Sequence, residues 1–345
     1  MQSQSSRRGF ILTAAGTSAA AVLGGRARAA AAEDARKTRS YNENMEYRRL
    51  GRTGLMISAV SIGGHWKRIP FKPGSDEFRK NRREVMYACL DHGINYVDAC
   101  SAAEVMVYAE AVKGRREEVF MGFDWTMARD PEIAGSPDRL KQGLDEGLKK
   151  SGLDYVDLWR ITLREQTTRN SQREIESVMA ALEWGKKTGK ARFTGIATHH
   201  RPWIAEAVAK YPQIEVVVTP YSAGSKEKPV GSMFDALRKQ GVGMIGIKPF
   251  ASGNLFASRG TPDSPTRGDD DERARMALRY VLCSDVLSAS IPGLITVDQV
   301  KNAAAAVRER RQFETTEVRR YEGLTAAMWQ RLPADYEWLR GWQWV

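Results

Sequence analysis

Short apolar runs alternate with amphipathic segments along most of this chain. The run from Ile94 to Asp98 is apolar up to its final carboxylate, which suits a buried strand. Residues 103–113 are rich in Ala, Val, Met and Glu and end at a glycine, which is typical of a helix. A second apolar run, Val119 to Phe123, is followed by Asp124. Strand, helix and strand within about 30 residues predict a βαβ unit with parallel strands.

The same alternation continues on both sides of this unit. Eight apolar runs are each followed by a segment with helical periodicity, and this order predicts an α/β fold, a (β/α)8 TIM barrel. A doubly wound sheet is the alternative, but it would usually have a GxGxxG turn after its first strand, and the sequence has none there. The expected strands are residues 55–62, 94–98, 119–123, 155–163, 191–197, 214–219, 243–248 and 286–291, and the expected helices are residues 77–92, 103–113, 136–151, 171–187, 203–210, 232–240, 272–283 and 297–309.

Changes in composition divide the chain into four parts. These are a signal peptide, a polar linker, the barrel and a C-terminal helical extension, at residues 1–29, 30–44, 45–312 and 313–345. The extension is rich in tryptophan near its end, at Trp338, Trp342 and Trp344. These three side chains are expected to pack on the outside of the barrel, and a contact between two copies of the chain is the alternative.

The first thirty residues have the composition of an export signal. Arg7 and Arg8 precede an apolar stretch rich in Ala, Gly and Thr, and Ala27, Arg28 and Ala29 offer a cleavage site. The apolar stretch is too short and too weakly hydrophobic to span a membrane. The arginine pair resembles the twin-arginine signal, which carries folded proteins, so we expect an exported, periplasmic protein that is free of the membrane after cleavage. A disordered tail is the alternative interpretation.

Charge and cysteine content disfavour several function classes. The 345 residues carry a formal net charge of +11, but the basic residues are interspersed with acids and form no stripe with aromatic residues. Nucleic acid is therefore not an expected partner. The three cysteines, Cys89, Cys100 and Cys283, form no CxxC pair, so neither a disulfide framework nor a cysteine-ligated metal is expected. A small molecule is the expected ligand.

Six segments of the chain follow one another in a consistent series. They are MEYRRLGRTGLMISAVSIGG (45–64), GINYVDA (93–99), VKGRREEVF (112–120), LDYVDLW (153–159), GKARFTGIAT (189–198) and IPGLITVDQVKN (291–302). In this order they resemble the first five strands and the cofactor segment of the aldo-keto reductase superfamily. The resemblance covers nearly all of the chain after the linker. It implies a (β/α)8 barrel and a NAD(P)-dependent oxidoreductase.

The resemblance also implies four catalytic groups. These are a Tyr that protonates the carbonyl group, a Lys that lowers the pKa of this Tyr, an Asp that holds the Lys, and a His that orients the substrate. Asp98 occupies the Asp position, but the Tyr, Lys and His positions hold Ala103, Asp124 and Thr162. Because a methyl group cannot donate a proton, we expect negligible NADPH-dependent reduction of generic aldehydes.

The cofactor positions that the resemblance implies are partly kept. Gln299 and Asn302 lie where the family holds the adenine end, and residues 248–253 resemble the loop after the seventh strand. Ala197 and Thr198 replace the pair that usually holds the carboxamide. No basic residue directly follows the last expected strand, so the 2′-phosphate of NADP has no obvious partner. The candidate cofactor-binding residues are Thr198, Tyr221, Lys248, Gly253, Gln299 and Asn302.

Polar residues also gather at the carboxyl ends of the expected strands, where the active sites of such barrels lie. Arg160 and Thr162 share strand parity, so both should point the same way, and the resemblance implies that this way is into the barrel mouth. Arg160 should then meet Asp98 or Asp124 there, and Asp98 is the preferred partner. A structural network of ion pairs is the alternative interpretation. The acids and histidines match no metal-ligand motif, and no metal site is assigned. The candidate catalytic residues are Asp98, Asp124, Arg160 and His199.

Three functional hypotheses follow. The first is an exported aldo-keto-reductase-like oxidoreductase that uses NAD(P) with a non-standard catalytic site. The second is a non-redox enzyme that uses the polar mouth, with Asp98, Asp124 and Arg160 acting on a sugar or an acid. The third is a barrel that binds a ligand without catalysis. Binding of NADH or NADPH to the mature protein would favour the first of these.

Overall fold

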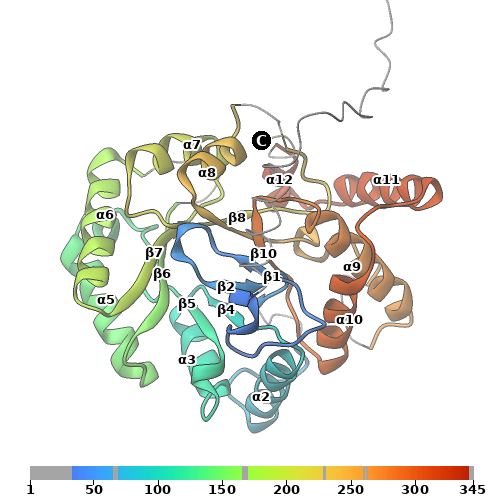
Figure 1. Ribbon diagram of the computed structural model, residues 1–345, viewed down its shortest axis with the longest axis horizontal. Helices are drawn as coiled ribbons and strands as arrows, with labels where there is room; N and C mark the ends of the chain where they lie inside the picture. The colour runs from blue at the N-terminus through green and yellow to red at the C-terminus, as the bar shows by residue number, and fades with distance from the viewer. Residues whose placement is uncertain are drawn as a thin grey trace, which may run out of the picture.

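The computed structural model describes residues 33–64, 69–164, 170–227, 231–258, 261 and 263–341. The predicted signal peptide lies outside these ranges, and so do Trp342 and Trp344. Figure 1 looks down a central ring of strands with helices around it. This arrangement is the predicted (β/α)8 barrel, and it excludes a doubly wound sheet.

Within the described residues, eight parallel strands form one sheet in the order β10-β9-β8-β7-β6-β5-β4-β3. The sheet closes where Val60 bridges Ser290 and the Ser61 amide donates to the Ser290 carbonyl at 2.9 Å. The strands are β3 (Ile62–Gly63), β4 (Tyr96–Ala99), β5 (Phe120–Phe123), β6 (Val156–Thr162), β7 (Ala191–Ala197), β8 (Val216–Pro220), β9 (Gly243–Ile247) and β10 (Leu287–Ile291).

Helices surround the strands on the outside of the barrel, as Figure 1 shows. Several begin at a serine or threonine whose hydroxyl accepts a backbone N–H, and Ser171 forms a capping box with Glu174. The helices are α2 (Asp76–Asp91), α3 (Ala102–Ala111), α4 (Pro131–Ala134), α5 (Pro137–Ser151), α6 (Gln172–Lys187), α7 (Arg201–Lys210), α8 (Met233–Gln240), α9 (Arg267–Val281) and α10 (Val297–Arg308).

The expected first strand, residues 55–62, is divided in the structure. Its first half is β2 (Met56–Ser58), which pairs antiparallel with β1 (Tyr47–Arg49), and only its end joins the barrel as β3. The hairpin closes the bottom of the barrel because its apolar side chains pack inside the ring of strands. The buried interior cluster contains Leu50, Leu55, Ile57, Tyr96, Phe120, Leu158, Ala197, Val216, Val218, Ile245, Ala289 and Ile291.

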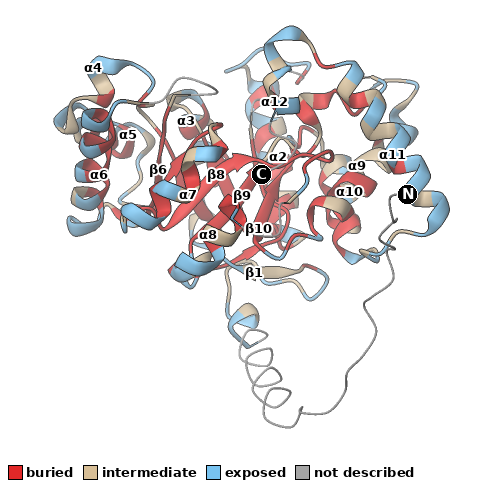
Figure 2. Cartoon of the chain, turned by 90° about the horizontal axis from the view of Figure 1, so that it is seen from above, coloured by how far each residue is buried: buried red, intermediate tan, exposed pale blue. Residues whose placement is uncertain are grey.

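A second and larger apolar layer lies between the strands and the helices. Figure 2 shows the strands and the inner faces of the helices as buried, with exposed residues on the outer faces. The bottom of the barrel is filled by the hairpin and its interior cluster. A ligand therefore has access to the barrel at its other end, where the strands finish.

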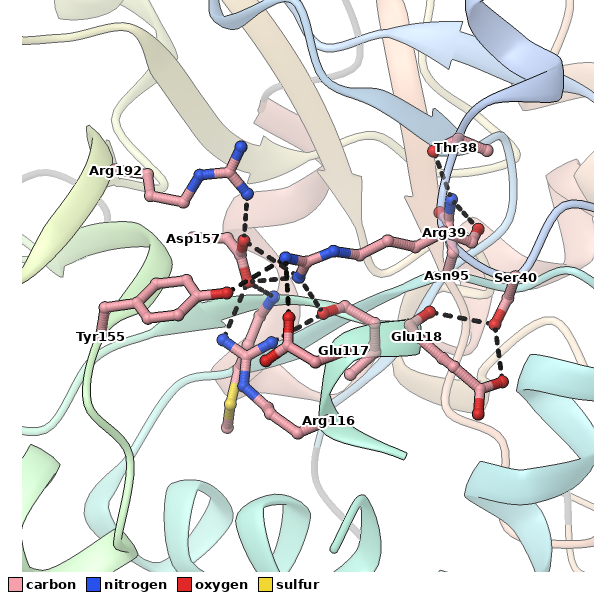
Figure 3. A network of polar contacts seen from close by, with 12 residues as sticks. Thr38, Arg39, Ser40, Asn95, Arg116, Glu117, Glu118, Tyr155, Asp157 and Arg192 are labelled. Carbon is pink, nitrogen blue, oxygen red and sulfur yellow. Dashed lines mark hydrogen bonds and ion pairs between the residues drawn. The ribbon is translucent and has the colours of Figure 1, made fainter. Parts of the chain in front are cut away.

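The expected polar linker, residues 30–44, packs against the barrel in its described part. Arg39 reaches the bottom of the barrel, where its Nη1 lies 3.2 Å from the Asp157 carboxylate. Arg116 and Arg192 contact the same carboxylate at 3.0 and 2.7 Å, and the Tyr155 hydroxyl lies 3.1 Å from Arg39 (Figure 3). Because Asp157 is fully buried, this cluster fixes the segment onto the barrel.

The predicted helical extension is present and consists of α11 (Thr315–Gln330), η4 (Ala334–Tyr336) and α12 (Trp338–Gly341). It forms a third apolar cluster with α9 and the segments after β8 and β9. Trp338 does not lie on the outer wall, because its ring stacks on His199 with centroids 4.6 Å apart. The extension therefore reaches the open end of the barrel.

Candidate functional site

A cavity of about 560 Å³ lies at the carboxyl ends of the strands. Its wall combines the ends of several strands with α9, α10 and the C-terminal extension. Asp124 and Tyr221 do not line it, whereas the other predicted site residues do. Those that line it are Asp98, Arg160, Thr198, His199, Lys248, Gly253, Gln299 and Asn302.

Asp98 and Arg160 form a buried ion pair at the cavity. Asp98 is on β4 and Arg160 on β6, and the guanidinium donates from Nε to Oδ1 at 3.0 Å and from Nη2 to Oδ2 at 2.5 Å. Nη1 donates to the Thr162 hydroxyl at 2.8 Å. Only 3% of Asp98 and 1% of Arg160 are exposed. The pairing predicted from strand parity is confirmed, and it gives the site a fixed guanidinium.

Asp124 was expected to lie in the cavity, but it lies behind this pair. Its Oδ2 accepts the Thr162 amide at 2.9 Å and lies 3.6 Å from Arg160 Nη1, while Oδ1 has no hydrogen-bond partner in the described part of the chain. Burial raises the pKa of Asp124, although the Arg160 charge acts in the opposite direction. Asp124 follows the last residue of β5, where strand alternation no longer directs its side chain.

Tyr221 also lies away from the cavity. Its ring packs edge-on against Phe234 of α8 at 5.8 Å, and its hydroxyl donates to Glu227 at 3.1 Å. Burial raises the pKa of the Tyr221 hydroxyl. The side chain turns outward after β8 and packs between the barrel and α8, so Tyr221 does not face the cavity, and its contact with a cofactor stays a prediction.

His199 lies on the cavity wall after β7 and is covered by Trp338. Burial, together with the charges of Lys248, Arg129 and Arg201, lowers the pKa of His199 to about 2. Its imidazole is therefore neutral at physiological pH. Sequence reasoning missed the covering residue because Trp338 lies far from His199 in the sequence.

The segment after β9 has an unusual backbone. Lys248, Ala251 and Ser252 have φ values of 59°, 46° and 57°, in the left-handed region that L residues rarely adopt, and Gly253 follows at 88°. Lys248, Ser252 and Gly253 line the cavity. Strained residues of this kind are held by the surrounding fold and cluster at ligand-binding sites. The sequence did not predict a positive φ at Lys248, Ala251 or Ser252, since among residue types glycine is the one that indicates it.

At the far end of the cavity, α9 and α10 provide polar groups. The Ile295 amide donates to Gln299 Oε1 at 2.9 Å, while the Gln299 amide nitrogen makes no hydrogen bond within the described residues. Asn302 is held by Arg275 Nη1 at 2.5 Å and donates to the Asp271 carbonyl at 2.9 Å. Arg267 also lines this end and was not predicted, because it was expected to lie in a loop.

The C-terminal extension supplies the remaining wall, through Pro333, Asp335 and Tyr336. The Tyr336 ring stacks on Trp338 at 6.1 Å, and Lys248 Nζ lies 5.8 Å from its centroid. Sequence reasoning did not assign Tyr336, since nothing in the pattern placed η4 over the barrel mouth. Among the described residues, no group of three or more His, Cys, Asp or Glu side chains could hold a metal ion.

Comparison with known proteins identifies the family. A model of the aldo/keto reductase family matches residues 61–275. The chain belongs to the aldo/keto reductase family. It is 26% identical to an L-galactose dehydrogenase of Arabidopsis thaliana, over 77% of this chain and 89% of the relative. It is 27% identical to an NADP(+) aldo-keto reductase of Schizosaccharomyces pombe, over 63% of this chain and 65% of the relative.

The fold is also that of aldo/keto reductases with solved structures. One such enzyme, from Klebsiella pneumoniae and in complex with NADP, has a TM-score of 0.61 at 16% identity, covering 81% of this chain and 95% of that chain. In the chain described here, Ala103 is an exposed residue on α3 and does not line the cavity. Thr162 lines the cavity and binds Arg160.

Proposed function

We propose that this aldo/keto reductase is a nicotinamide-dependent oxidoreductase that interconverts a carbonyl group and an alcohol with a non-standard catalytic site. The observation that carries the proposal is the cavity at the strand ends, in which a fixed guanidinium, a strained loop and a tyrosine meet. Family membership supports redox chemistry. Two similar proteins support a nicotinamide cofactor, since one is named for NADP(+) and another was solved with NADP.

The residues present fit such a cofactor. The amide nitrogen of Gln299, which makes no hydrogen bond among the described residues, provides a donor at the α10 end of the cavity, and Arg267, paired with Asp298 at 2.7 Å, provides a guanidinium there. The left-handed backbone from Lys248 to Gly253 brings the main chain to the cavity wall, where an extended phosphate-containing ligand would pass. Thr198, directly after β7, lines the same cavity.

When bound, the nicotinamide supplies or accepts the hydride, and the chain must supply the proton. Arg160 remains protonated in proteins and cannot do so. Burial raises the pKa of Cys100, which also lines the cavity, and His199 is neutral. Tyr336 is the remaining acid of suitable chemistry among these groups, and we assign it as the donor to the substrate oxygen.

Lys248 supports this assignment. Its Nζ lies 5.8 Å from the centroid of the Tyr336 ring, which places a positive charge beside the proposed donor. Solvent then reprotonates the phenolate that proton donation leaves. The Arg160 guanidinium lines the same cavity, is held by Asp98 and Thr162, and stabilises negative charge on the substrate oxygen. In this proposal the C-terminal extension contributes the proton donor that the methyl group of Ala103 cannot provide.

A barrel that binds a ligand without catalysis is the second candidate. It is favoured by the closed Asp98–Arg160 pair, in which each carboxylate oxygen of Asp98 already accepts a guanidinium hydrogen bond. Such a pair can stabilise the barrel without taking part in a reaction.

Titration of the purified mature protein with NADPH and with NADH tests the cofactor part of the proposal. We expect saturable binding, weakened about 5- to 10-fold by Gln299→Ala, since one hydrogen bond is lost. Gln240→Ala, at the exposed end of α8, is the matched control and should leave the affinity unchanged. If neither NADPH nor NADH binds, the nicotinamide-dependent function is contradicted.

A further inference from the structure

The end of the cavity between α9 and α10 combines an apolar wall with a few polar groups. Such a combination is the usual form of a small-molecule site, and it suits a flat heteroaromatic base. The amide nitrogen of Gln299, which makes no hydrogen bond among the described residues, is a donor on this wall. The apolar residues that line it are Ala274 and Leu278 of α9, Leu294 and Ile295 before α10, and Ala303 of α10.

The proposed chemistry decides which end of a dinucleotide lies there. Arg160 and Tyr336 are assigned to the substrate oxygen, so the nicotinamide must lie beside them to exchange hydride. Arg160 is on β6, and Figure 1 shows β6 on the opposite side of the barrel from α9 and α10. The left-handed segment, residues 248–253, lines another part of the same cavity. The adenosine of an extended dinucleotide therefore belongs between α9 and α10.

The charged groups at this end are more negative than positive. Among the described residues of α9 and α10 that line the cavity, Arg267 is the cation, and Asp270 and Asp271 are acids. Arg267 pairs through Nη2 with Asp298 at 2.7 Å, and its Nε lies 3.7 Å from Asp271. Asp270 is buried and accepts the Ala257 amide at 2.8 Å. The positive charge of Arg267 is therefore already offset before any ligand binds.

Asp271 is the more accessible of the two acids, with 32% of its side chain exposed. Burial raises the pKa of Asp271, the charges of Arg267 and Arg275 lower it, and those of Asp298 and Asp270 raise it again. The carboxylates at this end thus already repel one another, and a further anion would add to the repulsion. A hydroxyl group, in contrast, can donate a hydrogen bond to the Asp271 carboxylate.

We propose that the cavity discriminates between the two nicotinamide cofactors and prefers NADH to NADPH, with Asp271 accepting the 2′-hydroxyl of the adenosine ribose. This inference rests on the proposed function and names its cofactor. In NADPH the same hydroxyl carries a phosphate of about −1.5 to −2 charge at pH 7. Arg267, which could receive that phosphate, is already held by Asp298. NADPH is therefore expected to bind at the same place, but more weakly.

Calorimetric titration of the mature protein with NADH and with NADPH tests the preference without turnover. We expect NADH to bind about tenfold or more tightly than NADPH at low salt. The difference should shrink as salt is added, because the repulsion is screened. AMP and adenosine 2′,5′-bisphosphate, which lack the nicotinamide, should show the same order. Equal or tighter binding of NADPH would overturn the preference and leave the proposed function standing, whereas failure of both dinucleotides to bind would overturn the proposed function.

Variants on the two helices locate the discrimination. Asp271→Asn should tighten NADPH binding and weaken NADH binding, and Asp298→Asn, which releases Arg267, should tighten NADPH binding, so each narrows the affinity ratio by roughly threefold or more. Asp269→Asn, an exposed residue of the first turn of α9 that does not line the cavity, is the matched control and should leave the ratio unchanged. Thermal unfolding shows whether each variant is folded. An unchanged ratio in both folded test variants would overturn the proposal.

Discussion

At the scale of single residues, the Asp98–Arg160 pair is the most constrained feature of the site. Both groups are buried, and Arg160 is also the cation nearest to Asp124. Arg160→Met would leave two buried carboxylates without their cation, and we expect a loss of about 3–5 kcal/mol in the free energy of unfolding.

A double-mutant cycle tests the coupling of this pair. Asp98→Asn and Arg160→Met should each destabilise the barrel, and the double variant should lose less than the sum by about 1 kcal/mol or more. Denaturant titration measures each free energy of unfolding. A cycle between Asp98→Asn and Arg139→Met, an exposed residue paired with Glu132, is the control and should be additive. Strict additivity of the first cycle would contradict the coupling.

His199 predicts a dependence of stability on pH. Its folded pKa of about 2 lies below the ordinary value of 6.5, so the unfolded chain takes up a proton first as the pH falls. The contribution of a neutral His199 is present above pH 6.5 and is lost progressively toward pH 2. His199→Phe keeps the ring stacked on Trp338 and removes this term. Between pH 7 and pH 5, the free energy of unfolding of the variant should fall by about 2 kcal/mol less than that of wild type. Parallel stability curves would contradict a buried neutral histidine.

Some of these residues could be placed from the sequence and others could not. Arg160 was placed correctly because it lies inside β6, where side chains alternate strictly. Asp124 and Tyr221 were misplaced because both lie just beyond the last residue of their strands, where the loop decides the direction of the side chain. The strained backbone of Lys248 has no counterpart in residue type, so no pattern could reveal it.

At the scale of elements, α11 packs closely against the segment after β8. A Cβ atom on Gly224 would lie 2.1 Å from Cζ2 of Trp329 on α11, so Gly224→Ala must displace the helix. We expect a loss of about 1–3 kcal/mol in the free energy of unfolding. Gly323→Ala is the matched control on the same helix, since a Cβ there meets no atom within 4 Å, and it should gain up to about 1 kcal/mol. Equal effects of the two substitutions on thermal unfolding would contradict this docking.

The pattern of the chain predicted the elements better than their junctions. The alternation of apolar runs and amphipathic helices was enough to give the barrel, because each repeat must bury one face. It failed at residues 55–62, where one apolar run serves both the hairpin and β3. It also failed for Trp338, since the partner of an extension is set by long-range packing that local periodicity does not encode.

At the scale of the whole molecule, the barrel is closed at one end and capped at the other. The β1–β2 hairpin fills the bottom, where Asp157 holds Arg39 of the N-terminal segment and also pairs with Arg116 and Arg192 of the barrel (Figure 3). The C-terminal extension covers part of the top. Among the described residues, none of the helices has both the length and the apolar character needed to cross a membrane.

We propose that the protein is exported in the folded state to the periplasm. The arginine pair at Arg7 and Arg8 motivates this, because the twin-arginine route reads that pair. Replacement of both by lysine should leave the precursor in the cytoplasm, as measured by fractionation and immunoblotting. Lysine substitution of Arg26 and Arg28, outside the pair, is the control and should leave delivery intact. Normal delivery of the Arg7 and Arg8 variant would contradict twin-arginine export.

We propose that this barrel transfers hydride with a proton donor from its C-terminal extension. Consumption of NADPH in the presence of a panel of carboxylated and neutral aldehydes tests it most directly. We predict turnover of at least one aldehyde of the panel, and a loss of roughly 100-fold or more in kcat for Tyr336→Phe, with NADPH affinity unchanged. Bound NADPH that no aldehyde of the panel oxidises, or a Tyr336→Phe variant as active as wild type, would contradict this mechanism.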